Sequence, residues 1–151
     1  MLDPRLKKMA DTVIDYSLSI KAGERVMIET TKNCSDVLKY MIQKISGKGA
    51  IPFVLLNETD IKRELVKNGN EEQFKLMREH TENMLKNVDV YINMIDSDNC
   101  YDMSDVPSDK KALYQQHYFK PVYFEIIVPK LRWITVDYPS ISSAQQFGMS
   151  T

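Results

Sequence analysis

Apolar residues recur every three or four positions at the start of the chain: Leu6, Met9, Val13, Tyr16 and Ile20. This spacing predicts a helix with one apolar face. Asp3 is a typical N-cap residue, and Pro4 suits the first helical position because its missing N–H needs no partner there. Gly23 can adopt the left-handed conformation that often stops a helix, so we expect the helix to end near this residue.

Short apolar runs alternate with helical patterns along the rest of the chain. The pattern predicts strands at residues 25–29, 50–56, 89–95 and 131–136, and helices at 35–45, 59–67, 70–88, 108–119 and from 140 onward. Pro52 cannot donate to a sheet ladder, so it should lie near a strand start or on an edge strand. Pro121 should break or kink the helix that begins near Ser108, with a further turn or two at 122–128.

The alternation of strands and helices is typical of parallel βαβ units. We therefore predict an α/β fold in which a parallel sheet of about four or five strands carries helices on both faces, an α/β/α sandwich. The chain has 151 residues, the length of one ordinary domain. Residues 1–151 are accordingly interpreted as a single α/β domain.

Composition and charge exclude several classes of partner. With 20 Lys plus Arg against 21 Asp plus Glu, the net charge is −1, and no long basic run predicts a nucleic-acid surface. The pairs Lys7-Lys8 and Lys110-Lys111 are expected on helix surfaces. No apolar run is long enough for a membrane span or a signal peptide. Cys34 and Cys100 form no metal-ligand spacing and are interpreted as reduced thiols of a cytoplasmic protein.

Ligands of open α/β sheets bind outside the carboxyl ends of the strands. Four segments should meet at that edge: 30–35, 57–60, 96–102 and 138–143. None of the five glycines forms a phosphate-binding motif after a strand. Ser35 and Asp36 begin a helix that could meet an anion, but an acidic residue in a first turn more often caps the helix.

The segment Asp96–Asp102 is the most acidic loop of the chain. It partly matches a calcium-binding loop, but Tyr101 replaces the required glycine and Pro107 stands where the bidentate glutamate belongs. We therefore interpret the segment as a solvated loop that caps a helix.

No catalytic, cofactor-binding or metal-ligating residue emerges from the sequence. His80 and Glu82 form an HxE pair without the cysteine motif of a zinc deaminase, and His117 is the second of only two histidines. The HExxH and GxSxG motifs are also missing. We assign no site residue and no cofactor to this chain.

Aromatic residues gather around Pro121 and in the last strand: Tyr114, Tyr118, Phe119, Tyr123, Phe124 and Trp133. Core packing is the favoured interpretation. The alternative is a contact surface for another domain or subunit, because aromatic residues are enriched at interfaces.

The segment Asp15–Ile28, with its Tyr-Ser-Leu helix end and Lys-Ala-Gly-Glu turn, resembles the opening of M29 (AmpS/AmpT-type, thermophilic) aminopeptidases. Gly49-Ala50 before the second strand also fits. The strongest local match runs from Arg132-Trp133-Ile134 through Tyr138-Pro139 to Ala144-Gln145 and the final Gly148-Met149-Ser150. The resemblance extends over essentially the whole chain in the same order, although residues 96–105 depart from the family pattern.

This resemblance implies a longer parent protein, a metal-dependent aminopeptidase of which this chain is the amino-terminal domain. Two divalent metal ions, of the zinc, cobalt or magnesium class, would be held in the carboxy-terminal domain, so no ligand is carried over to a residue here. The resemblance also implies a homodimer acting on peptides, and we expect this chain alone to be inactive. The alternatives are a free-standing α/β binding or interaction module and, less favoured, a flavodoxin-like domain for small molecules or nucleotides.

Overall fold

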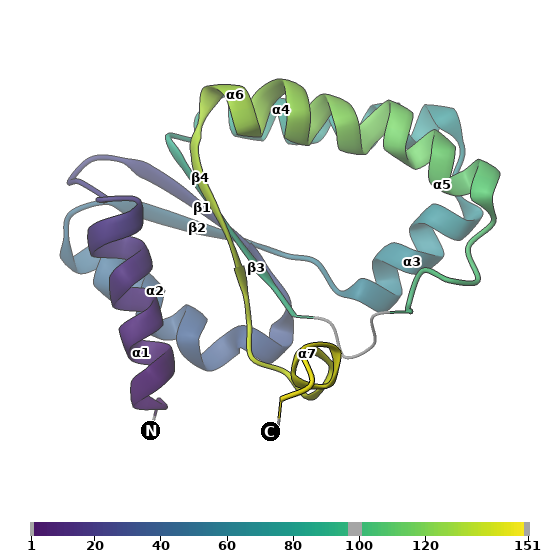
Figure 1. Cartoon of the computed structure of the whole chain (residues 1–151). Coiled ribbons are helices and arrows are strands. Elements are labelled where there is room, and N and C mark those ends of the chain that lie inside the picture. Colours follow the sequence, from purple (N-terminus) through teal and green to yellow (C-terminus); the bar gives the residue numbers. More distant parts are fainter. Residues whose placement is uncertain (1, 97–100, 150–151) are drawn as a thin grey trace.

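The computed structural model describes residues 2–96 and 101–149, and its centre is a four-stranded sheet (Figure 1). The strands are β1 (Arg25–Thr30), β2 (Ile51–Leu56), β3 (Val90–Ile95) and β4 (Arg132–Asp137). They are all parallel and lie in the order β2-β1-β3-β4. This arrangement confirms the predicted parallel α/β fold.

Helices cover both faces of the sheet, as the sequence predicted (Figure 1). The helical segments are α1 (Pro4–Asp11), η1 (Thr12–Ser17), η2 (Lys32–Cys34), α2 (Ser35–Gly47), α3 (Thr59–Asn68), α4 (Glu71–Leu85), α5 (Ser108–Tyr114), η3 (Gln115–Ile127), α6 (Val128–Lys130) and α7 (Ile141–Gln146). Here η1 and η3 are stretches with wider turns, in which an N–H reaches back five residues, as from Leu18 to the Val13 carbonyl at 3.0 Å.

The face covered by α1, η1 and α2 will be called the closed face. Alternate strand residues point into it: Val26, Ile28, Val90, Ile92 and Met94. They pack against buried aliphatic side chains of the helices, such as Ile14 and Met41. The side-chain period of two along each strand explains why aliphatic residues at every second position make one continuous core.

The opposite face, covered by α3, α4, α5, η3 and α6, will be called the open face. Met27 and Tyr91, the strand neighbours of Ile28 and Ile92, point into it and pack among Val66, Phe74, Val122 and other buried side chains. This core stops short of the carboxyl ends of the strands. Polar residues take over there, at the site described below.

Two turns that precede strands touch each other and fix the start of the sheet. Gly23 has φ +83° and donates its N–H to the Gly49 carbonyl at 2.8 Å. A Cβ atom on Gly49, whose own φ is +79°, would lie 3.3 Å from the Ala22 Cβ. The lysine-alanine-glycine turn before β1 and the glycine-alanine turn before β2 are therefore partners in one contact.

Several local predictions are confirmed. The Asp3 carboxylate accepts the Arg5 N–H at 2.7 Å at the start of α1, and the Asn70 side chain accepts the Gln73 N–H at 2.9 Å at the start of α4. Pro52 lies at the second position of β2, which is an edge strand. These outcomes depend on neighbouring residues only, which is why the sequence could predict them.

The helix does not break at Pro121, which was one of the two predicted outcomes. The helix runs from Ser108 without interruption through α5, η3 and α6 to Lys130 (Figure 1). Its turns widen from Gln115, six residues before the proline, which gives the ring room beside the preceding turn. Tyr118, Pro121, Val122 and Ile127 are buried on both sides of this point, and their packing outweighs the proline cost of about 3 kcal/mol.

Candidate functional site

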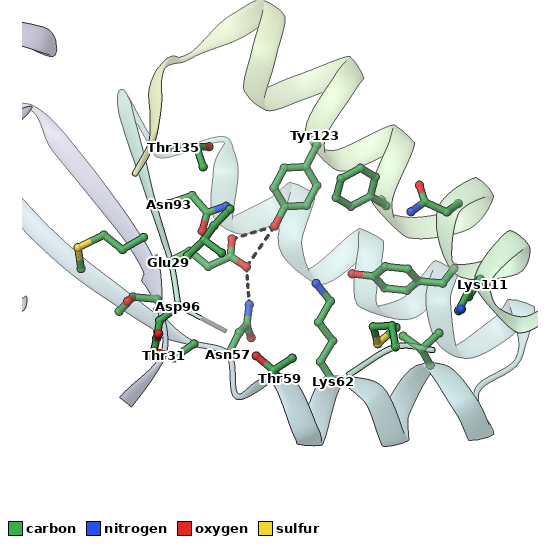
Figure 2. Close-up of a pocket in the computed structure, with 18 residues that line it drawn as sticks. Glu29, Thr31, Asn57, Thr59, Lys62, Asn93, Asp96, Lys111, Tyr123 and Thr135 are labelled. Carbon is green, nitrogen blue, oxygen red and sulfur yellow. Dashed lines mark hydrogen bonds between the residues drawn. The ribbon is translucent and has the colours of Figure 1, made fainter. Parts of the chain in front are cut away.

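A cavity of about 590 Å³ opens at the carboxyl ends of the strands on the open face (Figure 2). Its volume lies within the range of about 300–1,000 Å³ that is usual for small-molecule sites. Three of the four predicted edge segments reach it, through Thr30, Thr31, Asn57, Thr59 and Asp96. The fourth segment, residues 138–143, instead borders a second cavity beside Asp3 and Leu6.

A row of polar side chains crosses the sheet at the floor of the main cavity. Glu29 of β1 is in register with Asn93 of β3, and Asn93 is in register with Thr135 of β4. All three line the cavity, and Figure 2 shows them side by side. The row lies on the same face of the strands as Met27 and Tyr91. Those two residues are nearer the strand starts and belong to the open-face core.

Glu29 is the centre of a hydrogen-bond network that joins four elements (Figure 2). Asn57, after β2, donates its amide N–H to Oε1 at 2.5 Å. Tyr123 of η3 reaches Oε1 at 3.1 Å and Oε2 at 3.0 Å, and Tyr91 of β3 donates to Oε2. These hydrogen bonds hold the Glu29 carboxylate in one position.

The tyrosines around Glu29 remain neutral donors. Burial, with the Glu29 charge as a further cause, raises the pKa of Tyr91 and of Tyr123 well above the usual tyrosine value. Burial likewise raises the pKa of Tyr114, which lines the same cavity. These hydroxyl groups therefore stay protonated at neutral pH and hold the carboxylate in one orientation.

Asp96 is the second carboxylate of the cavity, and the solvated-loop interpretation is wrong for this residue. Its side chain is only 5% exposed and lines the cavity next to Thr31. Its Oδ1 atom has no hydrogen-bond partner among the described residues. Residues 97–100 of the predicted loop, which include Cys100, lie outside the described residues.

Two lysines line the wall of the cavity opposite the sheet. Lys62 of α3 points toward the Tyr114 ring, with Nζ 5.6 Å from the ring centroid, and Lys111 is half-buried on α5. Burial lowers the pKa of Lys62, and the Glu29 charge opposes this shift. Lys110, which was expected at the surface, is half-buried and donates to the Gly69 carbonyl at 2.8 Å.

The histidines and the start of α2 are remote from this arrangement. His80 is exposed on α4, and His117 of η3 lies 3.8 Å from Glu71. Asp36 lies in the first turn of α2, 3.9 Å from Lys39, as expected of a residue that favours a helix start. None of these residues lines the cavity.

The aromatic cluster divides between the two interpretations given for it. Tyr114 and Tyr118 are buried and stacked, with ring centroids 5.2 Å apart, and Phe119 stacks on Tyr123 at 4.6 Å. Phe124 and Trp133, by contrast, are 62% and 44% exposed. Core packing holds for the first four residues, while the last two present apolar surface.

The sequence analysis missed the main residues of the cavity: Glu29, Lys62, Tyr91, Asn93 and Tyr123. A signal for two of them was present. Glu29 and Asn93 are polar residues near the ends of otherwise apolar strands, and both stand at the strand parity opposite to the aliphatic positions. Lys62 lies on an exposed-looking helix pattern and Tyr123 was assigned to core packing, and only the tertiary structure shows that both line the cavity.

Comparisons with known proteins identify one matching family profile and several structures with a similar fold. The sequence profile of the thermophilic metalloproteases (M29) matches residues 2–149. Among solved structures, wild-type AmpT from Thermus thermophilus has a TM-score of 0.69 at 18% identity, covering 89% of this chain and 36% of that chain. The chain thus spans about a third of the length of AmpT. No curated protein matches the sequence.

Two further solved structures have TM-scores below 0.5. They are the CurK enoyl reductase, at 0.42 and 14% identity over 95% of this chain and 44% of that chain, and a short-chain dehydrogenase from Oenococcus oeni PSU-1, at 0.38 and 12% identity over 86% and 67%.

The layered parallel sheet, with a cavity outside the carboxyl ends of its strands, defines an open α/β protein. Because the profile matches nearly the entire sequence, the chain belongs to the thermophilic metalloprotease (M29) family. This result confirms the family that the sequence motifs indicated.

The name of the family implies that its members bind metal ions. Within residues 2–96 and 101–149, no group of three or more His, Cys, Asp or Glu side chains could hold a metal ion. The cavity offers two carboxylates, and donors rather than acceptors surround Glu29. The described residues thus do not fit a metal centre.

Among the helices of residues 2–96 and 101–149, none has the length and apolar character of a membrane span.

Proposed function

We propose that this chain is the amino-terminal domain of a cytoplasmic, metal-dependent aminopeptidase that removes amino-terminal residues from peptides. In this proposal the domain is non-catalytic, and it shapes substrate access or dimerisation. Two divalent metal ions of the zinc, cobalt or magnesium class are held by a carboxy-terminal domain. The observation that carries the proposal is the family match over residues 2–149, on a chain that spans 36% of AmpT.

The surface of the open face supports a role in contacts with another domain or subunit. Trp133 lies on β4, which has a neighbour on one side only among the described strands. Phe124 and Val128, on the helix that covers the same face, are 62% and 42% exposed. Apolar side chains of this size are frequent in buried interfaces between domains.

The proposal is tested by aminopeptidase assays with an aminoacyl p-nitroanilide and cobalt, zinc or magnesium. We expect the 151-residue protein to release no p-nitroaniline, and a longer gene product that contains it to be active and inhibited by a chelator. Activity in the 151-residue protein that a chelator abolishes would contradict the non-catalytic role.

The second candidate is a free-standing binding module, which the polar cavity favours. The intact mass of the protein isolated from its natural source separates the two proposals. A mass equal to that of the 151 residues supports the module, whereas a mass about three times larger supports the aminopeptidase domain, given that this chain spans 36% of AmpT.

A further inference from the structure

The charges in the main cavity are arranged in two groups. Glu29 and Asp96 lie on the side formed by the strand ends, whereas Lys62 and Lys111 lie on the side formed by α3 and α5 (Figure 2). None of these four residues forms an ion pair within 4.0 Å with another described residue. A ligand that carries both a positive and a negative group would complement both sides.

Glu29 has room for one more donor. A carboxylate has about four lone-pair sites. Asn57, Tyr91 and Tyr123 supply three donor groups, all of them neutral. The network therefore fixes the carboxylate without neutralising its charge, and a cationic donor in the cavity would both fill the remaining site and balance the charge.

Asp96 gives independent support for a cationic ligand. Only 5% of the Asp96 surface is exposed, and its Oδ1 atom has no hydrogen-bond partner among the described residues. A buried carboxylate oxygen without a donor is costly, so proteins rarely leave one in this state. Asp96 lines the same cavity as Glu29, so its carboxylate adds to the preference of this side of the cavity for a cationic group.

The remaining wall defines the rest of the ligand. Val66, Met94, Met103 and Phe119 give the cavity an apolar lining between its charged groups. An apolar side chain on the ligand would bury its surface against these residues. Lys62 has no described ion-pair partner and points into the space beside Tyr114, where it could meet a carboxylate.

We propose that this cavity binds a free amino acid with an apolar side chain, with its ammonium group on the side of Glu29 and Asp96 and its carboxylate on the side of Lys62 and Lys111. The proposal rests on the cavity and not on peptidase activity. A small zwitterion is the ligand class whose two charges match the two sides of the site. Its binding is measured without any hydrolysis, so its failure and the failure of the proposed function can be told apart.

The first experiment compares three ligands by isothermal titration calorimetry of the purified protein at pH 7. L-Leucine carries both charges, leucinamide only the ammonium group, and N-acetyl-leucine only the carboxylate. We expect leucine to bind, and each of the other two to bind at least about tenfold more weakly, because each leaves one side of the site unmatched. No saturation by leucine up to about 10 mM, or equal binding of N-acetyl-leucine, would overturn the proposal.

Two variants test the ammonium side. Glu29→Gln and Asp96→Asn keep the side-chain shape but remove a charge, and each should weaken leucine binding at least about tenfold. Asp96→Asn should keep the melting temperature at or above that of the unaltered protein, because it removes the charge of a buried carboxylate whose Oδ1 atom has no donor among the described residues. Glu79→Gln, at an exposed site on α4, is the matched control and should leave affinity unchanged. A melting temperature lowered together with affinity in Asp96→Asn would assign a structural role and overturn this part.

Lys62→Gln tests the carboxylate side, with leucinamide as the reference ligand. It should weaken leucine binding to the level of leucinamide and leave leucinamide binding unchanged, since leucinamide offers no carboxylate. Lys120→Gln, at an exposed position of η3, serves as its control. An equal loss for both ligands would show that Lys62 supports the site only by packing, and would contradict its assignment as a carboxylate contact.

Discussion

The two faces of the sheet use the same strands in different ways. On the closed face, Ile28 and Ile92 are fully buried among aliphatic side chains, and charges appear only at its rim. On the open face, the next residues along the same strands, Glu29 and Asn93, border a cavity. A single step along a strand thus separates a position that stabilises the fold from one available for ligands. The comparison shows that the aliphatic core of the closed face follows the strands further, whereas the core of the open face gives way to a cavity at the carboxyl ends of the strands.

The largest expected effect comes from truncating the closed face. Ile92→Ala should lower the free energy of unfolding by about 3–4 kcal/mol, because Ile92 is 0% exposed in a central strand and its loss leaves a cavity. The neighbouring Asn93→Ala, on the wall of the existing cavity, should cost less than about 1 kcal/mol. Urea unfolding of both variants measures the difference, and similar costs would refute the division between the faces.

Removing a donor from Glu29 should have the next largest effect. Tyr91→Phe deletes one hydrogen bond to a partly buried carboxylate and should cost about 1.5–3 kcal/mol at pH 7. Tyr16→Phe, at a side chain 82% exposed, is the control and should be close to neutral in the same unfolding experiment. A neutral Tyr91→Phe would mean that the network does not hold Glu29.

Alkaline pH should weaken the open face through its buried tyrosines. The pKa of Tyr114 is raised by burial, so above a pH of about 10 the unfolded chain loses this proton while the folded protein keeps it. Stability is therefore complete below that pH and falls above it. Tyr114→Phe removes this loss and should be about 1.4 kcal/mol more stable than the unaltered protein at pH 11, relative to their difference at pH 7. Unfolding curves of both proteins at the two pH values measure this difference in stability. A difference that is the same at both pH values would contradict the prediction.

Acidic pH should lower the stability contributed by the closed face, and this is the smallest of the predicted effects. Lys44 of α2 lies 2.5 Å from both Asp11 and Asp15, and hydrogen bonds from Lys44 are the main cause that lowers the pKa of each aspartate. A lowered carboxyl pKa stabilises the fold above a pH of about 4, and this contribution is lost as the pH falls through the folded-state value.

Because the aspartates are partly exposed, Lys44→Gln should cost less than about 1 kcal/mol at pH 7. The cost should decrease toward zero at a pH of about 2, where the aspartates are protonated in both states. Urea unfolding at the two pH values measures it, with Lys120→Gln as the control. A cost that is the same at both pH values would exclude this ion-pair cluster as its source.

Much of the fold could be predicted because it depends on local sequence patterns. The Asp3 and Asn70 caps, the edge position of Pro52 and the four strands all follow from spacing and residue type within a few neighbours. Pro121 shows the limit of such reasoning. Its helix continues because Val122 and Ile127 are buried against another helix, and that energy does not appear in the local sequence.

The candidate site was predicted only in outline. The rule that ligands bind at the carboxyl ends of parallel strands correctly placed Asn57 and Asp96 at one edge. It could not give the strand order, and so could not show that Glu29 lies beside Asn93, or that Tyr123 meets both β1 and β3. The hydrogen bonds of Tyr91 and Tyr123 to Glu29 join residues 62 and 94 positions apart in the chain.

The sequence by itself determined the α/β class, the parallel sheet and the family, because periodicity, caps and short motifs act over a few residues. The tertiary structure alone decided which polar residues share a cavity. Sheet register and helix packing bring Glu29, Asp96 and Lys62 together from three separate elements, and the free energy of burying their charges depends on that enclosure and not on any one segment.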